Sequence, residues 1–268
     1  MDRHRVKPGQ RMDLAKWDAD GVGGFSGSKA DAEQRVQKLR SRLEQLQELL
    51  YAEHLHKLLV VLQAMDSGGK DGTIRHVFES VNPQGVSVTR FQEPTPSELE
   101  HDYLWRVHPH VPGKGEMVIF NRSHYEDVLV VRVHGLVPEP ERVWRRRYEE
   151  IREFERMLAN EGTTILKFFL HISKDEQKKR LQARLDDPDK RWKFAYSDVR
   201  EREFWGKYQK AYEEAIEKTS TEWAPWYVVP ANHKWYRNLV VATTITETLA
   251  GLKMKFPKPK LPKKLVLK

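Results

Sequence analysis

Apolar residues along the chain follow two patterns, a spacing of three and four residues in long stretches and short continuous runs between them. In residues 29–53 they recur at spacings of three and four, which places them on one face of a long amphipathic helix. The stripe comprises Val36, Leu39, Leu43, Leu46 and Leu50. We expect it to pack on the protein's own core, with a dimer seam as the alternative. Residues 140–160 predict a second long helix, whose buried side is marked by Trp144, Tyr148, Ile151, Phe154 and Leu158.

Short apolar runs between helical stretches predict strands. They lie at residues 57–64, 86–91, 116–121, 163–171 and 225–229. The other helical stretches lie at about 70–80 and 96–107, after Ser173, and at 198–218 and 234–252. Because strands that alternate with helices are typical of βαβ units, we predict an α/β fold with a central, mostly parallel five-stranded sheet.

Ligands of such sheets bind beyond the carboxyl ends of the strands. The loops after the first and third strands, residues 65–72 and 121–127, should therefore face each other across one cleft. We expect one domain over residues 29–254, with 174–200 as a lid. Residues 1–28 are polar, basic and without periodicity, and predict an arm or a loosely packed extension. Residues 255–268 contain three prolines and many lysines, and predict a flexible basic tail.

The stretch LLVVLQAMDSGGKDGT, residues 58–73, carries the clearest functional signal. A strand ends in a glycine-containing loop with one lysine, and a helix follows. Gly68, Gly69 and Gly72 let backbone N–H groups turn toward an anion. The helix adds its positive N-terminal end, and Lys70 adds an ammonium group. The order predicts a site for phosphoryl groups, with a plain strand-to-helix connection as the alternative.

The match to the general Walker A pattern, G-x-x-x-x-G-K-[ST], is partial. Ala64 stands at the first glycine position, Asp71 follows the lysine, and Thr73 comes two residues late. Asp66 lies inside the loop, where it can bind magnesium through water or accept a hydrogen bond from the attacking phosphate. A turn-stabilising role is the alternative for this residue.

The segment NRSHYED, residues 121–127, follows the third strand. Arg122 can hold a phosphate bidentately. Ser123 and Glu126 form a helix-capping pattern, which we favour over a Ser–His nucleophile because no orienting acid is evident. Glu126 and Asp127 are candidate metal ligands. Helix capping and stabilisation by the helix dipole are their alternatives.

A basic run follows the fourth strand, and Trp192 lies within it. Its cations are Lys178, Lys179, Arg180, Arg184, Lys190, Arg191 and Lys193. We interpret the run as a lid that excludes water and brings arginines to the transition state, where one arginine can accelerate phosphoryl transfer by ~10³–10⁵. A solvated helix face is the alternative.

The composition narrows the choice of partners. The chain of 268 residues has no cysteine, which excludes disulfides and thiolate metal sites. It shows no signal peptide and no apolar run near the ~20 residues of a membrane helix, so we expect a soluble, cytoplasmic protein. A formal net charge of +8 favours polyanionic partners. We read the pairs His54/His56 and His108/His110 as surface or helix-end histidines, because neither has the further ligands of a metal site.

Together these blocks resemble the polyphosphate kinase 2 family. The matching blocks are AMDSGGKDG (64–72), VNPQG (81–85), YLWR (103–106), FNRSHYED (120–127) and KRWKF (190–194). The resemblance covers about residues 39–252. It implies a three-layer P-loop kinase fold similar to thymidylate kinase, with a helical lid. It also implies Mg²⁺- or Mn²⁺-dependent, reversible phosphoryl transfer between inorganic polyphosphate and the nucleotides AMP, ADP and ATP.

The resemblance assigns roles to named residues. Asp66, Lys70 and Arg122 would be catalytic, and Asp66, Glu126 and Asp127 would bind the metal. The expected phosphate and polyphosphate ligands are Ser67, Gly68, Gly69, Lys70, Asp71, Gly72, Thr73, Arg184, Lys190, Arg191 and Lys193. The expected nucleotide ligands are Arg75, Phe78, Asn82, Pro83, Asn121, Arg122, Glu126 and Asp127.

One residue departs from the usual family pattern. Many members have Asp where Asn121 stands, and a neutral amide is a weaker metal ligand. Asn121 with Glu126 is similar to the subgroup that phosphorylates both AMP and ADP, often called class III. Family resemblance also implies a homo-oligomer, a dimer or tetramer. An ATP-dependent nucleotide kinase and a basic nucleic-acid-binding protein are the alternatives. We expect neither a membrane nor a nucleic acid as partner, since RNA-binding sheet motifs and zinc-finger spacing are lacking.

Overall fold

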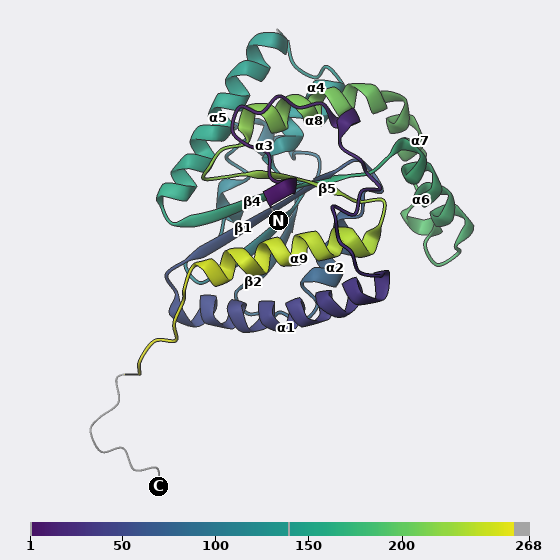
Figure 1. The fold of residues 1–268 in the computed structure, drawn as a ribbon. Helices are drawn as coiled ribbons and strands as arrows, with labels where there is room; N and C mark the ends of the chain where they lie inside the picture. Colours follow the sequence, from purple (N-terminus) through teal and green to yellow (C-terminus); the bar gives the residue numbers. More distant parts are fainter. Residues whose placement is uncertain (1, 139, 260–268) are drawn as a thin grey trace, which may run out of the picture.

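The computed structural model describes residues 2–138 and 140–259. Its centre is a five-stranded sheet in the order β2-β3-β1-β4-β5, and every neighbouring pair is parallel (Figure 1). The strands are β1 (Lys57–Ala64), β2 (Val86–Arg90), β3 (Met117–Asn121), β4 (Thr163–His171) and β5 (Trp226–Pro230). The predicted α/β fold with a parallel five-stranded sheet is confirmed.

Helices cover both faces of the sheet (Figure 1). On one face lie α1 (Lys29–Glu53), α2 (Lys70–Val77) and α9 (Lys234–Gly251), and on the other lie α4 (Val130–Val133), α5 (Pro140–Asn160) and α8 (Trp205–Thr219). Central strand β1 is buried along all but its first residue. Its unbroken apolar run follows from this position, because a parallel strand between two helical layers has no solvent side.

The long helix α1 packs along α9 (Figure 1). Four residues of its apolar stripe, Val36, Leu43, Leu46 and Leu50, are buried in the core, and Leu39 packs against it. This arrangement confirms that the stripe serves the protein's own core. The capping box of Ser28 and Asp31 begins the helix, and His54 in the left-handed conformation ends it.

The predicted helix over residues 96–107 is wrong beyond its first turn. α3 (Pro96–Leu99) begins at the capping box of Thr95 and Glu98, as the sequence indicates. It ends there because Asp102 Oδ1 accepts hydrogen bonds from the backbone N–H groups of Leu104 and Trp105, at 3.0 and 3.1 Å. Such a side-chain turn competes with continuation of a helix.

The predicted helix at 198–218 is divided in two. It consists of α7 (Tyr196–Glu201), a 3₁₀ turn (Arg202–Phe204) and α8. Before it comes α6 (Lys174–Asp186), which is capped by the Ser173 hydroxyl. α6 and α7 project from one side of the body, at the edge where the central strands end (Figure 1).

The N-terminal segment is packed, which corrects the expectation of a loosely packed arm. Val6 N donates to Trp226 O of β5 at 2.8 Å, and Leu14 N donates to Glu213 Oε1 of α8 at 2.7 Å. His4, Val6 and Leu14 are all buried. The pattern did not reveal this packing because the segment meets the core through isolated residues, without the period of a helix or strand.

Only part of the predicted basic tail can be compared with the structure. Residues 255–259 are exposed and form neither helix nor strand, and residues 260–268 lie outside the described residues. Within the described part of the chain, no helix combines the length and apolar character needed to cross a bilayer.

Candidate functional site

The loops after β1 and β3 meet at one edge of the sheet, as predicted. We call residues 65–72 the phosphate loop and residues 121–128 the acceptor loop. They are close because β1 and β3 are hydrogen-bonded neighbours, with Leu62 opposite Asn121. Asn121 Nδ2 donates to Asp71 Oδ1 at 2.7 Å, and Arg122 Nη2 lies 3.4 Å from Asp66 Oδ1.

A cavity of about 410 Å³ opens beside these two loops. Its polar lining includes Asp66, Arg122, Glu126, Asp198, Glu201 and Tyr208. Its apolar lining includes Leu129 and Val130. A concave site with an apolar wall and converging charged groups is the usual form of a small-molecule site.

Glycine is required in the phosphate loop at Gly69. Its φ is +99°, it precedes the first residue of α2, and a Cβ there would overlap Nη1 of Arg237. Thr73 Oγ1 donates back to Gly69 O at 3.1 Å and holds this turn. The first backbone N–H groups of α2 therefore face the loop, as in a site for phosphate.

Lys70 is placed at the meeting point of the two loops. Its Nζ donates to Ala64 O at 3.2 Å. Burial, followed by Arg122, lowers the pKa of this ammonium, while Asp66, Glu126 and Asp71 act in the opposite direction. The cation is partly desolvated, so an anion that reaches it gains more than it would from a solvated lysine.

Arg122 connects the phosphate loop to the cavity. Its guanidinium lies 3.4 Å from Asp66 and 3.6 Å from Glu126. Burial disfavours the charge, but Glu126 and Asp66 outweigh burial and raise the pKa of Arg122. Its backbone has φ +64°, a left-handed conformation that side chains other than glycine rarely adopt.

Asp127 faces away from the cavity. Arg147 Nη1 donates to its backbone oxygen at 2.6 Å and lies 3.8 Å from Oδ1. Burial raises the pKa of Asp127 to about 6, against the effect of Arg147 and Arg106. Of the two acids in the predicted metal set that follow β3, the structure brings Glu126 to the cavity and directs Asp127 to Arg147.

The comparisons with known proteins agree on one family. The sequence profile described as Polyphosphate kinase 2 matches residues 26–257. The AMP/ADP-polyphosphate phosphotransferase of Meiothermus ruber is 63% identical over 97% of this chain and 96% of its own length. The ADP-polyphosphate phosphotransferase of Rhodopseudomonas palustris is 46% identical over 94% of this chain and 91% of its own.

The chain belongs to the polyphosphate kinase 2 family. A solved relative supports the same assignment at the level of structure. The crystal structure of Polyphosphate Kinase 2 from Arthrobacter aurescens TC1 superposes with a TM-score of 0.93 at 47% identity, over 97% of this chain and 92% of that one. The resemblance of the motifs to this family is thereby confirmed.

In this polyphosphate kinase 2 family member, one of the four predicted phosphate ligands in residues 174–200 reaches the phosphate loop. Arg184 Nη2 donates to Ser67 Oγ at 3.1 Å, and its Nη1 lies 3.3 Å from Asp198. The other three, Lys190, Arg191 and Lys193, lie exposed between α6 and α7. There, Lys190 pairs with Asp187, Arg191 donates to Leu185 O, and Lys193 lies over Trp192.

Several predicted nucleotide ligands lie elsewhere in the fold. Arg75 is exposed on α2, and Phe78 is buried in the core directly after that helix. Asn82 Oδ1 accepts from Gln84 N, and Pro83 is exposed beside it. None of these four lines the cavity beside the two loops.

The structure adds two supports that are absent from the predicted phosphate ligands, one of them a cation of the predicted basic run. Arg180 of α6 donates to Ser67 O and Gly68 O, at 3.1 and 3.2 Å, and Gln177 donates to Asp66 O at 2.9 Å. The helical spacing of 177, 180 and 184 on one face was a signal that could have found them.

Arg237 of α9 lies against Gly69 and is 1% exposed. Burial, followed by Arg180, lowers its pKa to about 9. Only the fold brings it to the phosphate loop, and nothing in the pattern around residue 237 indicated that contact.

Proposed function

We propose that the chain is a polyphosphate-dependent nucleotide kinase, which transfers the terminal phosphate of inorganic polyphosphate to AMP and ADP and, in reverse, takes it from ATP. The observation that carries this proposal is the meeting of a glycine-lined phosphate loop with a separate cavity, joined by Arg122. The printed names of the relatives, which include both AMP/ADP- and ADP-polyphosphate phosphotransferases, support the substrates.

The donor would lie on the phosphate loop. Backbone N–H groups at the start of α2 and the Lys70 ammonium would hold its terminal phosphates. Arg184, already within 3.1 Å of Ser67, would add charge from the lid. In the transfer, an oxygen of the nucleotide's last phosphate bonds to the terminal phosphorus, and the P–O bond to the chain breaks. The shortened chain leaves with the electron pair, and the surrounding cations stabilise the negative charge.

The acceptor would lie in the cavity, with its phosphate toward Arg122. The guanidinium can hold a phosphate bidentately, and Asp66 and Glu126 lie 3.4 and 3.6 Å from it. Asp66 borders both loops, and there it can orient or deprotonate the attacking phosphate. The apolar side chains of Leu129 and Val130 would face the rest of the nucleotide.

Asp66 and Glu126 are the residues that would hold Mg²⁺ or Mn²⁺. Magnesium is usually bound through one or two carboxylates together with substrate phosphates, and two carboxylates flank Arg122 here. The described residues contain no group of three or more metal-binding side chains, so substrate oxygens would complete the site. The ion would supply charge neutralisation at the phosphates.

Asn121 supports the assignment to the subgroup that uses both AMP and ADP. Its amide donates to Asp71 Oδ1 at 2.7 Å, so it links the two loops as a hydrogen-bond donor. An aspartate there would place two carboxylates together. Its neutral amide instead leaves metal binding to Asp66 and Glu126.

The proposal is tested with purified protein, Mg²⁺, long-chain polyphosphate and AMP, in the absence of ATP. Chromatography should show ADP first and ATP later. A matched reaction with ATP in place of polyphosphate separates this function from that of an ATP-dependent kinase. Product formed only with ATP as donor, or unchanged AMP and ADP in the presence of polyphosphate, would overturn the proposal.

A further inference from the structure

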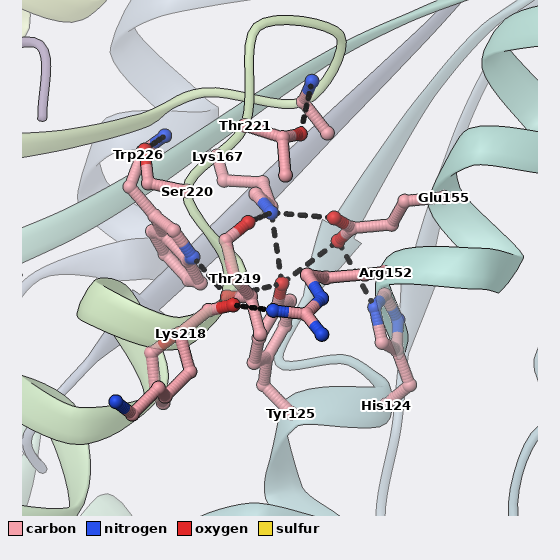
Figure 2. A network of polar contacts seen from close by, with 12 residues as sticks. His124, Tyr125, Arg152, Glu155, Lys167, Lys218, Thr219, Ser220, Thr221 and Trp226 are labelled. Carbon is pink, nitrogen blue, oxygen red and sulfur yellow. Dashed lines mark hydrogen bonds and ion pairs between the residues drawn. The ribbon is translucent and has the colours of Figure 1, made fainter. Parts of the chain in front are cut away.

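A network of buried polar side chains lies behind the acceptor loop, outside the cavity (Figure 2). The Tyr125 hydroxyl is at its centre. It lies 2.8 Å from Glu155 Oε1 of α5, 2.9 Å from Lys167 Nζ of β4 and 2.9 Å from Thr219 Oγ1 of α8. All four side chains are fully buried. The network therefore ties the acceptor loop to three elements of the core.

The ion pair at the base of this network is fully hydrogen-bonded. Lys167 Nζ donates to Glu155 Oε2 at 2.5 Å, to the Tyr125 hydroxyl, and to Thr219 O at 2.8 Å, so each of its three N–H groups has an acceptor. Glu155 also contacts His124 Nε2 at 3.3 Å. Burial is the largest single influence and opposes ionisation of Glu155, but Lys167 and His124 together lower the pKa of this carboxyl.

Stability alone is a weak explanation for such a pair. Two charges lose their hydration when buried, and apolar side chains of similar volume often stabilise a core equally well or better. A fully connected polar network does something that an apolar cluster does not, because its hydrogen bonds permit one orientation of each member. Tyr125, unlike a phenylalanine at the same place, is fixed in position by its hydroxyl.

Tyr125 lies on the acceptor loop between Arg122 and Glu126, the two residues that face the cavity. Arg122 has φ +64°, and such a strained conformation persists only where the surroundings over-determine it. Its own side-chain contacts, at 3.4 and 3.6 Å, are too long to fix the guanidinium alone. Its direction therefore depends also on its backbone, which is held by the hydrogen bond from Arg122 N to Leu62 O at 3.2 Å and, three residues on, by Tyr125.

We propose that the Tyr125 hydroxyl, held by Glu155, Lys167 and Thr219, is a positioning group for Arg122, so that the buried network sets the geometry of phosphoryl transfer without touching substrate. The inference rests on the proposed function for its readout, which is turnover of AMP with polyphosphate.

The test is a double-mutant cycle between Tyr125→Phe and Arg122→Lys. The phenylalanine keeps the ring that packs edge-on against Trp226 and removes only the hydroxyl. We expect kcat to fall about 10-fold in the wild-type background, since displacement of a group by ~1 Å can cost up to ~10²-fold. In the Arg122→Lys background the same change should leave kcat almost unchanged, because the guanidinium that Tyr125 would position is already absent. KM for AMP should change little.

Tyr148→Phe is the matched control. Tyr148 is another buried tyrosine of α5, and its hydroxyl accepts a hydrogen bond from Arg132 at 2.7 Å, a residue outside the network around Tyr125. It should lose stability without losing kcat. If Tyr125→Phe does not fold, Thr219→Val removes one hydrogen bond from the same hydroxyl, and the cycle is repeated with it.

Wild-type kcat in the folded variant would overturn the inference, as would an equal loss in both backgrounds. A merely structural role would lower the melting temperature and leave kcat per folded molecule unchanged. Wild-type protein without activity on polyphosphate and AMP would instead refute the proposed function, so the two failures are distinguishable.

Discussion

The two loops that meet at the sheet edge are held in place in opposite ways. The phosphate loop is held by its backbone, since Arg180 and Gln177 donate to the carbonyl oxygens of residues 66, 67 and 68. The acceptor loop is anchored at its centre by a side chain, since the Tyr125 hydroxyl enters a buried network (Figure 2), and near its end Arg147 donates to Asp127 O. The supports of the first loop include the cation Arg180, whereas the network behind the second loop has the Lys167–Glu155 ion pair at its base.

The difference follows from what each loop must present. A phosphate is recognised by N–H groups and diffuse positive charge, so the phosphate loop needs a backbone without side chains in the way. The acceptor loop instead presents the side chains of Arg122 and Glu126 to the cavity, and under the proposed function these must point in the right direction to bind their ligand. A loop of that kind needs side chains that fix it from behind. Four changes test this comparison.

The largest effect is expected from removing charge at the meeting point. Lys70→Ala and Asp66→Asn should each lower kcat with polyphosphate and AMP at least ~10²-fold, in the range of a lost transition-state contact. Lys38→Ala, at an exposed lysine of α1, is the charge-matched control and should retain full turnover. Near-normal rates in either site variant would remove that residue from the mechanism.

Addition of one methyl group should damage the phosphate loop alone. Gly69→Ala forces a side chain into a left-handed backbone and against the buried Arg237, so we expect kcat to fall by up to ~10²-fold through displacement of the loop. Gly206→Ala in the first turn of α8, where a Cβ meets open space, should keep kcat and slightly raise the melting temperature. Equal turnover of the two variants would show that the left-handed turn at Gly69 is dispensable.

Substitution of the two acids of the acceptor loop should have different effects on the Mg²⁺ concentration that the reaction requires. Glu126→Gln is expected to raise the Mg²⁺ concentration for half-maximal rate by at least ~10-fold, since Glu126 faces the cavity. Asp127→Asn should leave that concentration nearly unchanged, because Asp127 lies against Arg147. A titration of rate against Mg²⁺ checks both. Similar shifts in the two variants would return Asp127 to the metal site.

The smallest effect on turnover is expected in the N-terminal segment, at His4. Its Nε2 lies 3.0 Å from the hydroxyl of Tyr236, the neighbour of Arg237 in α9. Burial, followed by Arg3, lowers the pKa of His4 from 6.5 to about 4. The unfolded chain thus binds a proton between pH 6.5 and 4 that the folded chain does not. The stabilisation is complete above pH 6.5 and is lost as the pH falls toward 4.

The size of this loss is up to about 3 kcal/mol, from the difference between the two pKa values. Urea unfolding at pH 7.5 and pH 4.5 should show it in the wild type. In His4→Gln, which cannot take up the proton, the loss between the two pH values should be smaller by about this amount. An identical pH dependence in the two proteins would show that His4 does not titrate in this way.

Local signals predicted the phosphate loop well. The strand, the glycines around Lys70 and the following helix are adjacent in sequence, so each restricts the conformation of the next. The meeting of residues 66 and 122 was also predictable, since parallel strands present their carboxyl ends at one edge. The start of the helix after Thr95 was predicted, but its end after one turn was not. A capping box marks where a helix begins and says nothing about the turn at Asp102 that ends this one.

Support from distant elements escaped prediction for a different reason. Arg237 is an ordinary arginine in a helix, and its burial against Gly69 depends on how α9 packs. Lys167 and Glu155 are charged residues in a strand and a helix that the pattern would place at a surface. Their pairing around Tyr125 exists only after β4, α5 and α8 have assembled.

The amino-acid sequence by itself determined the parallel sheet, the alternation of strands and helices, and the glycine-containing loop between β1 and α2. The reason is that the period of apolar residues and the backbone freedom of glycine are properties of neighbouring residues. Only the tertiary structure decided which acid of the acceptor loop faces the cavity, which arginines reach the phosphate loop and which buried side chains surround the Tyr125 hydroxyl. Those outcomes depend on the desolvation and pairing of charges between segments that meet only when the chain has folded.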